Sequence, residues 1–228
     1  MNQLKTIDVT LRDGGNRVNF HFSKENLDTI LPLLDQSGIE WIEIGYRNGA
    51  IRPVDDIGTA GLCHKAFLLY CQSRLKRANI AVMAHPQNLS HNDIRELKAC
   101  GVSLRRICVS RGQLNKAFPV IEQSQHEGLA VSVNFIHASQ YTDEELDKVI
   151  LQTSRYHPDI IYLADSNGSF LPEKVASIYH QYVSQYPISF GFHAHDNLGL
   201  AQANAIAAVN AGATFIDYAL AGMGKGIG

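Results

Sequence analysis

The sequence has little of several features that mark particular classes of protein. Lysine and arginine (20) are balanced by aspartate and glutamate (22), so the chain lacks the basic surplus typical of proteins that bind nucleic acid or anionic membranes. No stretch reaches the roughly 18 apolar residues that a membrane-spanning helix needs. The chain does not open with a basic segment followed by an apolar one, which a secretory signal requires. These absences favour a cytoplasmic protein with a small-molecule substrate, without nucleic-acid or membrane partners.

Cysteines and linkers are also scarce. The four cysteines form no Cys-x-x-Cys pair, and a domain of this size does not need disulfide bonds, so we expect reduced thiols. Hydrophobic residues make up 45% of the 228 residues, which is ample for a packed core. No low-complexity tract or block of like charges divides the chain. We therefore expect one domain over residues 1–228.

Short β-branched runs alternate with amphipathic stretches throughout the chain. Their starts recur about every 25 to 40 residues, the length of one strand-plus-helix unit. Eight runs predict strands, at Thr6–Leu11, Trp41–Tyr46, Ile80–Ala84, Arg106–Val109, Ala130–Ile136, Ile160–Ala164, Ile188–Phe192 and Thr214–Ala219.

Capping signals mark helices between these runs. Thr142 and Glu145 form a full capping box, whereas Ser23 with Asn26 predicts only a partial one, because Asn stands where Glu or Gln is usual. The clearest further helices are predicted at Asp93–Ala99, Glu144–Tyr156, Glu173–Gln185 and Leu198–Asn210.

Strict strand–helix alternation is typical of two α/β architectures, the TIM (β/α)8 barrel and the doubly wound open sheet. The turn after the first predicted strand reads Arg12-Asp13-Gly14-Gly15-Asn16, which is not the glycine fingerprint of a dinucleotide-binding sheet. Charged and polar residues instead follow several predicted strands. The carboxyl ends of all barrel strands form one rim, where active sites lie, so we predict a TIM barrel.

A metal site is indicated by His193 and His195. Alternate residues of a strand point to one face, with Cα atoms roughly 6.5–7 Å apart, so both imidazoles can reach one cation. Asp13 is the best third ligand, because only one strand separates the first and seventh strands of an eight-stranded barrel. Two imidazoles and a carboxylate suit an open catalytic metal site. Hydrogen-bonded core histidines and a surface Arg12–Asp13 ion pair are the alternative interpretations.

Five segments, in order along the chain, resemble the signature motifs of the pyruvate-handling TIM-barrel metallolyases. This superfamily includes hydroxymethylglutaryl-CoA lyase, isopropylmalate synthase and 4-hydroxy-2-oxovalerate aldolase. The segments are Thr10-Leu11-Arg12-Asp13-Gly14, Ile42-Glu43-Ile44-Gly45, Ala164-Asp165-Ser166-Asn167-Gly168, His193-Ala194-His195-Asp196-Asn197 and Ala221-Gly222-Met223-Gly224-Lys225-Gly226.

The resemblance implies a divalent metal bound by Asp13, His193 and His195. Mn²⁺ or Mg²⁺ is the first choice, and the ligand chemistry also allows Co²⁺ or Zn²⁺. It further implies that a 2-oxo acid binds the metal through its keto and carboxylate oxygens, and that the metal stabilises the pyruvate enolate formed when a carbon–carbon bond is broken or made. Arg12 would place a permanent positive charge beside the developing oxyanion.

Departures from the superfamily's pattern separate its branches. The acyl-CoA condensing enzymes and the CoA lyase carry Gln, Glu or Asn directly after Arg-Asp-Gly, whereas here Gly15 follows. The oxovalerate aldolases place a proton-transferring histidine near the position of Asn16, which cannot titrate. The chain therefore resembles a loosely defined group of aldolase-like proteins near the 4-hydroxy-2-oxovalerate aldolases. We expect an aldolase acting on a 4-hydroxy-2-oxo acid.

Proton transfer then needs another residue. His137, past the end of an inward-facing strand, is our first choice for the base, with His85 and His21 as alternatives. A hydrogen-bonded structural role is the competing interpretation for each histidine.

Three residues are predicted to contact substrate. Gly14 opens the backbone for close approach, Glu43 orients Arg12 or a metal-bound water, and Ser166 donates to a substrate carboxylate. Structural roles remain open for all three.

Two other functions also remain open. One is a Claisen-type condensation of a 2-oxo acid with an acyl-CoA. The other is a metal-binding barrel without turnover that acts as a partner subunit, which the absence of a histidine at Asn16 favours. The chain ends inside the glycine-rich loop after the eighth predicted strand, so we expect the eighth helix to be missing. A truncated protein, a homo-oligomer or a partner element that covers this gap would each explain it.

Overall fold

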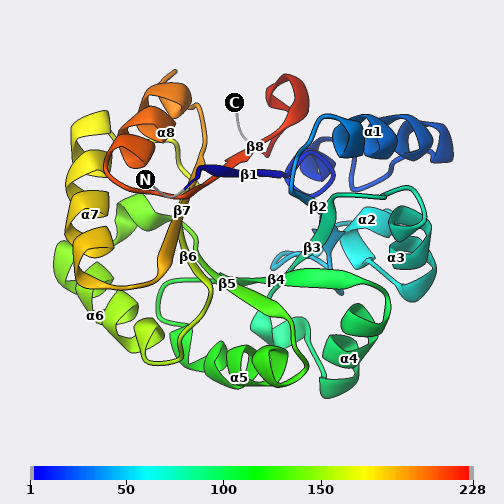
Figure 1. Ribbon diagram of the computed structural model, residues 1–228, viewed down its shortest axis with the longest axis horizontal. Helices are drawn as coiled ribbons and strands as arrows, with labels where there is room; N and C mark the ends of the chain where they lie inside the picture. The colour runs from blue at the N-terminus through cyan, green and yellow to red at the C-terminus, as the bar shows by residue number, and fades with distance from the viewer. Residues whose placement is uncertain (1–2, 226–228) are drawn as a thin grey trace.

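Eight parallel strands form the centre of the molecule. In the computed structural model, which describes residues 3–225, each strand pairs with its neighbours in sequence order, and β8 pairs with β1 to close the barrel (Figure 1). The predicted TIM barrel is therefore confirmed. The strands are β1 (Lys5–Asp8), β2 (Trp41–Tyr46), β3 (Asn79–Ala84), β4 (Val102–Val109), β5 (Ala130–Phe135), β6 (Ile160–Asp165), β7 (Ser189–Ala194) and β8 (Phe215–Tyr218).

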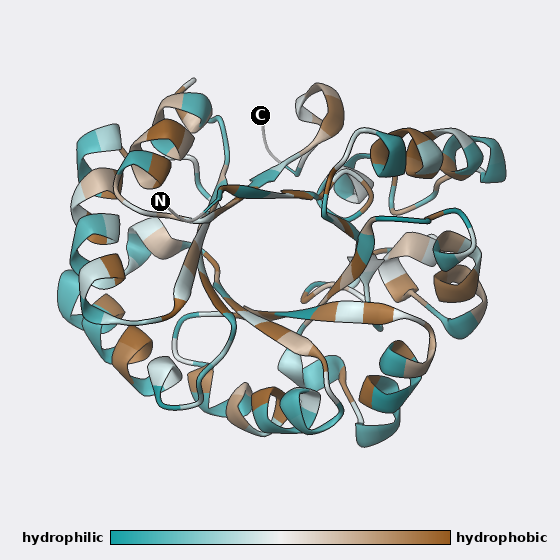
Figure 2. Cartoon of the chain, in the orientation of Figure 1, coloured by the Kyte–Doolittle hydropathy of each residue, from teal (hydrophilic) through white to brown (hydrophobic). Residues whose placement is uncertain are grey.

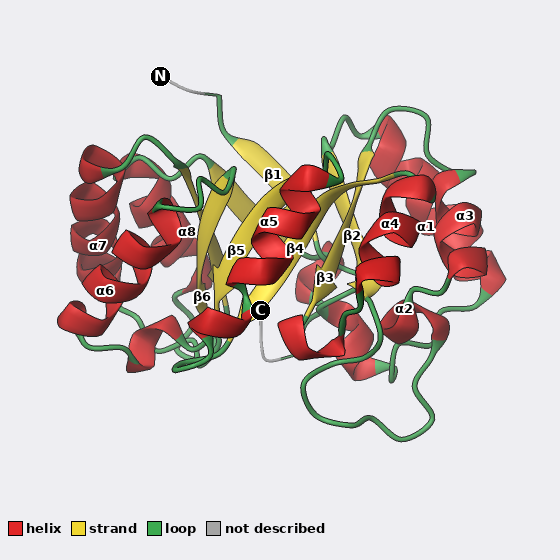
Figure 3. Cartoon of the chain, turned by 90° about the horizontal axis from the view of Figure 1, so that it is seen from below, coloured by secondary structure: helices red, strands yellow, loops and turns green. Residues whose placement is uncertain are grey.

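Helices surround the barrel, and Figure 3 shows them flanking the tilted strands from the side. Within residues 3–225, two α-helices follow β2, one follows each of β1 and β3 to β7, and none follows β8. They are α1 (Lys24–Gln36), α2 (Thr59–Leu62), α3 (Lys65–Gln72), α4 (His91–Ala99), α5 (Phe118–His126), α6 (Asp143–Ser154), α7 (Pro172–Gln185) and α8 (Ala201–Asn210).

Three helices begin with reciprocal capping boxes, in which the cap side chain and the third helical residue each accept the other's backbone N–H. The caps are Ser23, Ser90 and Thr142. The expectation of only a partial box at Ser23 is wrong. The amide oxygen of Asn26 accepts the Ser23 N–H at 3.3 Å, because an amide oxygen can replace the carboxylate that usually makes this bond.

β1 ends earlier than the predicted run Thr6–Leu11. The Asp8 carboxylate accepts hydrogen bonds from the Thr10 N–H and hydroxyl at 3.1 and 2.8 Å, which turns the backbone. The Asp13 N–H then bonds to the Val9 carbonyl at 2.7 Å. Asp13 therefore lies on a tight turn above the barrel rather than on the strand itself.

Two other boundaries differ from prediction for similar local reasons. α8 begins at Ala201 rather than Leu198, because the Asp196 carboxylate accepts the Ala201 N–H at 2.7 Å. β4 begins at Val102, before the predicted start at Arg106, because the sheet pairing of β3 and β4 extends there.

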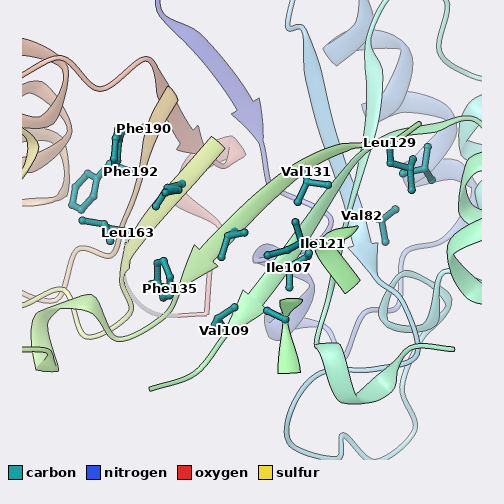
Figure 4. Close-up of a cluster of buried hydrophobic side chains, with 14 of the residues drawn as sticks. Val82, Ile107, Val109, Ile121, Leu129, Val131, Phe135, Leu163, Phe190 and Phe192 are labelled. Atoms are coloured by element: carbon teal, nitrogen blue, oxygen red, sulfur yellow. The ribbon is translucent and has the colours of Figure 1, made fainter. Parts of the chain in front are cut away.

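Apolar side chains pack on both sides of the strands. The larger layer lies between strands and helices and includes the residues labelled in Figure 4; Figure 2 shows brown segments on the helices where they face the barrel. A smaller layer fills the inside of the barrel, formed by Ile7, Val9, Ala81, Leu104, Ile160, Tyr162 and Phe215. Arg106 lies two residues after Leu104 on β4, and Asp217 lies two residues after Phe215 on β8, so both point to the same inward face. The inner packing therefore changes from apolar to charged towards the carboxyl ends of the strands.

The outer face of β8 and β1 is thinly covered. Between α8 and α1, Figure 1 shows only the short 3₁₀ turn η5 (Leu220–Gly222). Ile216 on β8 is only partly buried, and Leu33 of α1 and Ile206 of α8 are 61% and 62% exposed. The expected absence of a helix after β8 thus holds for residues 3–225. Gly226 to Gly228 of the glycine-rich loop lie outside the described residues.

The cysteines and the lengths of the helices can be compared with the sequence-based expectations. The four cysteines are buried and unpaired. Among residues 3–225, we find no helix with the length and apolar character needed to cross a bilayer.

Candidate active site and metal centre

Three side chains of metal-binding type meet at the carboxyl ends of the strands. The nearest ligand atoms of Asp13, His193 and His195 all lie within 4.8 Å of one another. The Nε2 atoms of the two histidines are 3.2 Å apart, and Nε2 of His193 lies 4.0 Å from Oδ1 of Asp13. The fold therefore brings together the three residues that the sequence suggested as ligands.

A strand end and a glycine contact position the histidines. His193 lies in β7, and His195 follows the last residue of that strand. Gly168, in the loop after β6, has a φ of +56°, and a Cβ atom there would lie 2.7 Å from the His195 carbonyl oxygen and the Asn197 nitrogen. Glycine is thus required where the two loops pack backbone against backbone.

Asp13 is held from two sides. Nη1 of Arg12 donates to Oδ1 at 2.6 Å, and the backbone N–H of Lys225 donates to Oδ2 at 3.0 Å. The glycine-rich loop after β8 therefore lies directly against the site. Gly14 permits this approach, because a Cβ atom there would be 2.9 Å from Cγ of Met223. The space at Gly14, which we expected to accommodate substrate, is occupied by Met223.

Arg12 belongs to a buried network of four charged side chains. Nε of Arg12 donates to Oε2 of Glu43 at 2.6 Å, and the same oxygen accepts from Nη1 of Arg106 at 3.1 Å. Nη2 of Arg106 donates to Oδ2 of Asp217 at 2.8 Å. All four are buried, so each charge depends on its partners rather than on water.

The sequence analysis missed the roles of Arg106 and Asp217. Oδ2 of Asp217 lies 2.8 Å from Nδ1 of His193, which holds that imidazole with its Nε2 towards the cluster. A carboxylate behind a metal-binding histidine is a common arrangement that fixes the ring's orientation. The available signal was charge inside otherwise apolar strand runs: one aspartate in Phe-Ile-Asp-Tyr at 215–218 and two arginines in Arg-Arg-Ile-Cys-Val at 105–109.

The protonation states favour metal ligation. Burial would raise the pKa of Asp13, but Arg12 and the neighbouring histidines hold it below its usual value. Burial also raises the pKa of Asp217, and Arg106 together with the His193 hydrogen bond outweighs this and keeps the carboxyl ionised. Burial is the main cause that lowers the pKa of His195 to about 4, so its imidazole is neutral at pH 7.

The donor set fits a divalent cation. Because the Asp217 carboxylate can only accept, the His193 proton resides on Nδ1, and Nε2 offers its lone pair. Adjacent ligands on an octahedral ion, each at about 2.1 Å, are separated by about 3 Å. The 3.2 Å between the two Nε2 atoms matches that spacing. Two nitrogens and one carboxylate oxygen leave coordination positions free for a substrate.

Two other predicted residues lie together at the ends of β5 and β6. The His137 N–H donates to Oγ of Ser166 at 3.0 Å, and Nδ1 of His137 lies 2.9 Å from Oδ1 of Asn167. Within residues 3–225, no hydrogen bond or ion pair links His137 or Ser166 to the Asp13 cluster. Asp165 has a structural contact, because Oδ2 accepts the Phe170 N–H at 2.8 Å.

The alternative bases differ in exposure. His21 is exposed, and its Nε2 lies 2.7 Å from the carbonyl oxygen of Asp56. His85 is buried after β3, and its ring stacks on that of Tyr46. Tyr46 in turn lies 5.9 Å from the guanidinium carbon of Arg12, so His85 is connected to the charged network and His21 is not.

Comparison with known proteins identifies the family of this chain. The family model described as HMGL-like matches residues 3–228. This chain belongs to the HMGL-like family. It is 32% identical over 225 residues to the 4-hydroxy-2-oxovalerate aldolase of Moorella thermoacetica, covering 97% of this chain and 66% of that protein. It is 30% identical over 222 residues to the oxaloacetate decarboxylase of Mycobacterium tuberculosis, with coverage of 97% and 66%.

Solved structures of similar fold extend the comparison. The N-terminal domain of a proposed aldolase from Bacteroides vulgatus superposes with a TM-score of 0.84 at 28% identity, covering 98% of this chain and 75% of that one. The carboxyl transferase domain of Rhizobium etli pyruvate carboxylase gives 0.82 at 15% identity, covering 98% and 41%, which is a likeness of fold alone. This HMGL-like chain spans about two thirds of the length of the curated relatives it matches.

Proposed function

We propose that this protein is a divalent-metal-dependent aldolase that cleaves or forms the C3–C4 bond of a 4-hydroxy-2-oxo acid, with pyruvate and an aldehyde as the products of cleavage. The observation that carries the proposal is the Asp13–His193–His195 cluster with Arg12 beside it. Membership of the HMGL-like family and the similarity to proteins named 4-hydroxy-2-oxovalerate aldolase support it.

Mn²⁺ or Mg²⁺ is the ion proposed for this cluster, and Co²⁺ or Zn²⁺ also suits its ligands. Bound there, a divalent ion supplies Lewis-acid polarisation of the substrate's 2-oxo group. Asp217 and Arg106 keep His193 oriented for the ion, and Lys225 holds the second oxygen of Asp13 through its backbone N–H.

Arg12 is proposed to stabilise negative charge on the substrate. In cleavage, the C4 hydroxyl loses its proton to a base, C4 becomes the aldehyde carbon, and the electron pair of the C3–C4 bond moves towards the 2-oxo oxygen. C3 then takes up a proton to give pyruvate. Arg12 is buried and held by Glu43 and Asp13, whose charges outweigh burial and keep its pKa well above the usual value, so its charge is already in place when the bond breaks.

His137 is proposed as the residue that takes the hydroxyl proton, with Ser166 near the substrate carboxylate. Asn167 orients the His137 ring and leaves Nε2 without a described partner in residues 3–225. His137→Asn should then lower kcat by about 10²- to 10⁴-fold. A rate within threefold of wild type removes His137 from the mechanism.

The deciding experiment is pyruvate release from a panel of 4-hydroxy-2-oxo acids with added Mn²⁺. Wild type should release pyruvate, and Asp13→Ala should not. A site that stays metal-free at saturating Mn²⁺ contradicts the proposal. Metal binding without turnover of any panel member would instead favour the non-catalytic subunit. Release of free CoA from an acyl-CoA and a 2-oxo acid would favour the Claisen-type condensation.

A second candidate reaction is decarboxylation of a 2-oxo acid. The similarity to the oxaloacetate decarboxylase of Mycobacterium tuberculosis favours it. Oxaloacetate therefore belongs in the same assay with CO₂ measured alongside pyruvate. A kcat/KM for oxaloacetate higher than for every hydroxy acid would replace the aldolase assignment.

We also propose that another element covers the outer face of β8 and β1. The helices on either side of this face, α1 and α8, carry mostly exposed apolar side chains at Leu33 and Ile206. Either a second copy of the chain or an additional segment would bury them. Light scattering distinguishes these, because a homo-oligomer has a multiple of the 25.2 kDa chain mass. A single domain remains our expectation from the absence of linkers, and a cytoplasmic location remains our expectation from the reduced cysteines.

A further inference from the structure

His85 is a buried polar side chain that the proposed mechanism leaves unused. It directly follows β3 and is only 3% exposed. Its ring lies parallel to that of Tyr46, with centroids 5.7 Å apart and planes 10° apart. Tyr46 also lies close to Arg12, whose guanidinium carbon is 5.9 Å from the centre of the Tyr46 ring. Side chains from the ends of three consecutive strands therefore form one continuous arrangement.

The ring nitrogens of His85 make no hydrogen bond to any residue in the range 3–225. The other histidines that are not exposed all have a ring partner; these are His137, His193 and His195. The His85 nitrogens are also not among the polar core atoms that are sealed from solvent without a partner. These ring nitrogens therefore reach solvent-accessible space at the site. A molecule that enters the site can hydrogen-bond to them.

The charge state of His85 limits what that molecule presents. Burial, together with the charges of Arg12 and Lys225, lowers the pKa of His85 to about 4, so the ring is neutral at pH 7. A neutral imidazole offers one donor and one acceptor. That pair matches a hydroxyl group, which can both donate and accept. A pKa this low is poorly matched to proton transfer at neutral pH, so His85 does not duplicate the role proposed for His137.

The strand order indicates which part of a substrate His85 faces. The metal ligands come from β7 and the loop after β1, whereas His85 follows β3, on the other side of β1 from β7 and β8. Arg12 lies between, linked to Asp13 on one side and to Tyr46 on the other. A substrate whose 2-oxo and carboxylate groups are at the metal ligands therefore extends past Arg12 with its other end towards His85.

We propose that His85 is a specificity-determining residue that binds a hydroxyl group on the aldehyde-forming half of the substrate. This inference rests on the proposed aldolase function. It narrows the substrate class to 4-hydroxy-2-oxo acids with a further hydroxyl beyond C4.

The test compares two substrates that differ by one hydroxyl, 4,5-dihydroxy-2-oxopentanoate and 4-hydroxy-2-oxopentanoate. Pyruvate release gives kcat and KM for each with wild type and His85→Leu. Wild type should prefer the dihydroxy acid. The variant should lose about 10- to 100-fold in kcat/KM for the dihydroxy acid while staying within threefold for the other. His85→Gln, which keeps a donor and an acceptor, should recover part of the preference, and the exposed His126→Leu should change neither substrate.

Each outcome has a defined meaning. An equal loss on both substrates shows that His85 acts on a common group or on folding, and overturns the inference. An unchanged preference in His85→Leu overturns it as well, while wild-type pyruvate release leaves the aldolase function intact. If wild type releases pyruvate from neither substrate, the proposed function fails, and the assignment of His85 fails with it.

Discussion

Oδ2 of Asp217 lies 2.8 Å from Nδ1 of His193, and the same oxygen accepts a hydrogen bond from Arg106 at 2.8 Å. One carboxylate oxygen thus joins a candidate metal-binding histidine to a guanidinium inside the barrel. Asp217 orients His193 and is itself held by its ion pair with Arg106. The geometry of the site therefore depends on residues from β4, β7 and β8 together.

Removing the carboxylate should weaken metal binding without removing a ligand. In Asp217→Asn, the amide can donate where the carboxylate could only accept, so the His193 Nδ1 proton and ring orientation are no longer fixed. We expect the affinity for Mn²⁺ to fall about 10- to 100-fold by isothermal titration. Asp55→Asn, at an exposed position, is the matched control and should bind as wild type does. Equal affinity in the Asp217 variant contradicts the orienting role.

Metal binding should stabilise the fold measurably. A ligand that binds only the folded state adds about 2.7 kcal/mol at a concentration of 100 times its Kd. After dialysis against a chelator, addition of Mn²⁺ should raise the melting temperature of wild type. Asp13→Ala should show no such rise, because it lacks one of the three clustered ligands. A rise of the same size in both proteins would place the ion elsewhere.

Gly168→Ala should disturb the site through the backbone. The added Cβ atom would lie 2.7 Å from the His195 carbonyl oxygen, which displaces that loop and weakens Mn²⁺ binding. Gly112→Ala is a close control, because Gly112 also has a positive φ, +77°, but no atom within 4 Å of the added Cβ. Both variants carry the strain of a positive φ, about 1 kcal/mol. Only the first should lose metal affinity, and equal affinities would show that the contact is unimportant.

The stability of the protein should depend on pH through Asp8. Burial raises the pKa of Asp8 to about 6, above its usual value of 3.8, despite two hydrogen bonds from Thr10. The folded state therefore binds this proton more tightly than the unfolded state does. The stabilisation of the folded state by protonated Asp8 is present in full below pH 4 and is lost as the pH rises to about 6.

The measurement is urea unfolding at pH 4 and pH 7 for wild type and Asp8→Asn. The variant resembles the protonated acid at every pH. We compare the free energy of unfolding of the variant with that of wild type at each pH. The difference, variant minus wild type, should be about 2–3 kcal/mol larger at pH 7 than at pH 4. A difference that does not change with pH would mean that Asp8 titrates normally in the folded protein.

Much of the fold follows from short-range signals. The alternation of strand and helix patterns predicts the barrel because each segment's apolar period matches its own element. Local boundaries were less predictable where a side chain competes for the backbone. Asp8 ends β1 early, and Asp196 delays α8, because each carboxylate captures an N–H that the strand or helix pattern would have used.

The candidate site divides in the same way. Asp13, His193 and His195 are marked by residue type, spacing and position after strands, so the sequence by itself was enough to predict that these three side chains cluster. Asp217 and Arg106 lie 111 residues apart, and only closure of the barrel brings them into contact. Tertiary structure also decided the contact of Lys225 with Asp13 and left His85 without a protein partner. The physical reason is that buried ion pairs and hydrogen bonds form only where the packed strands bring two side chains within about 3 Å.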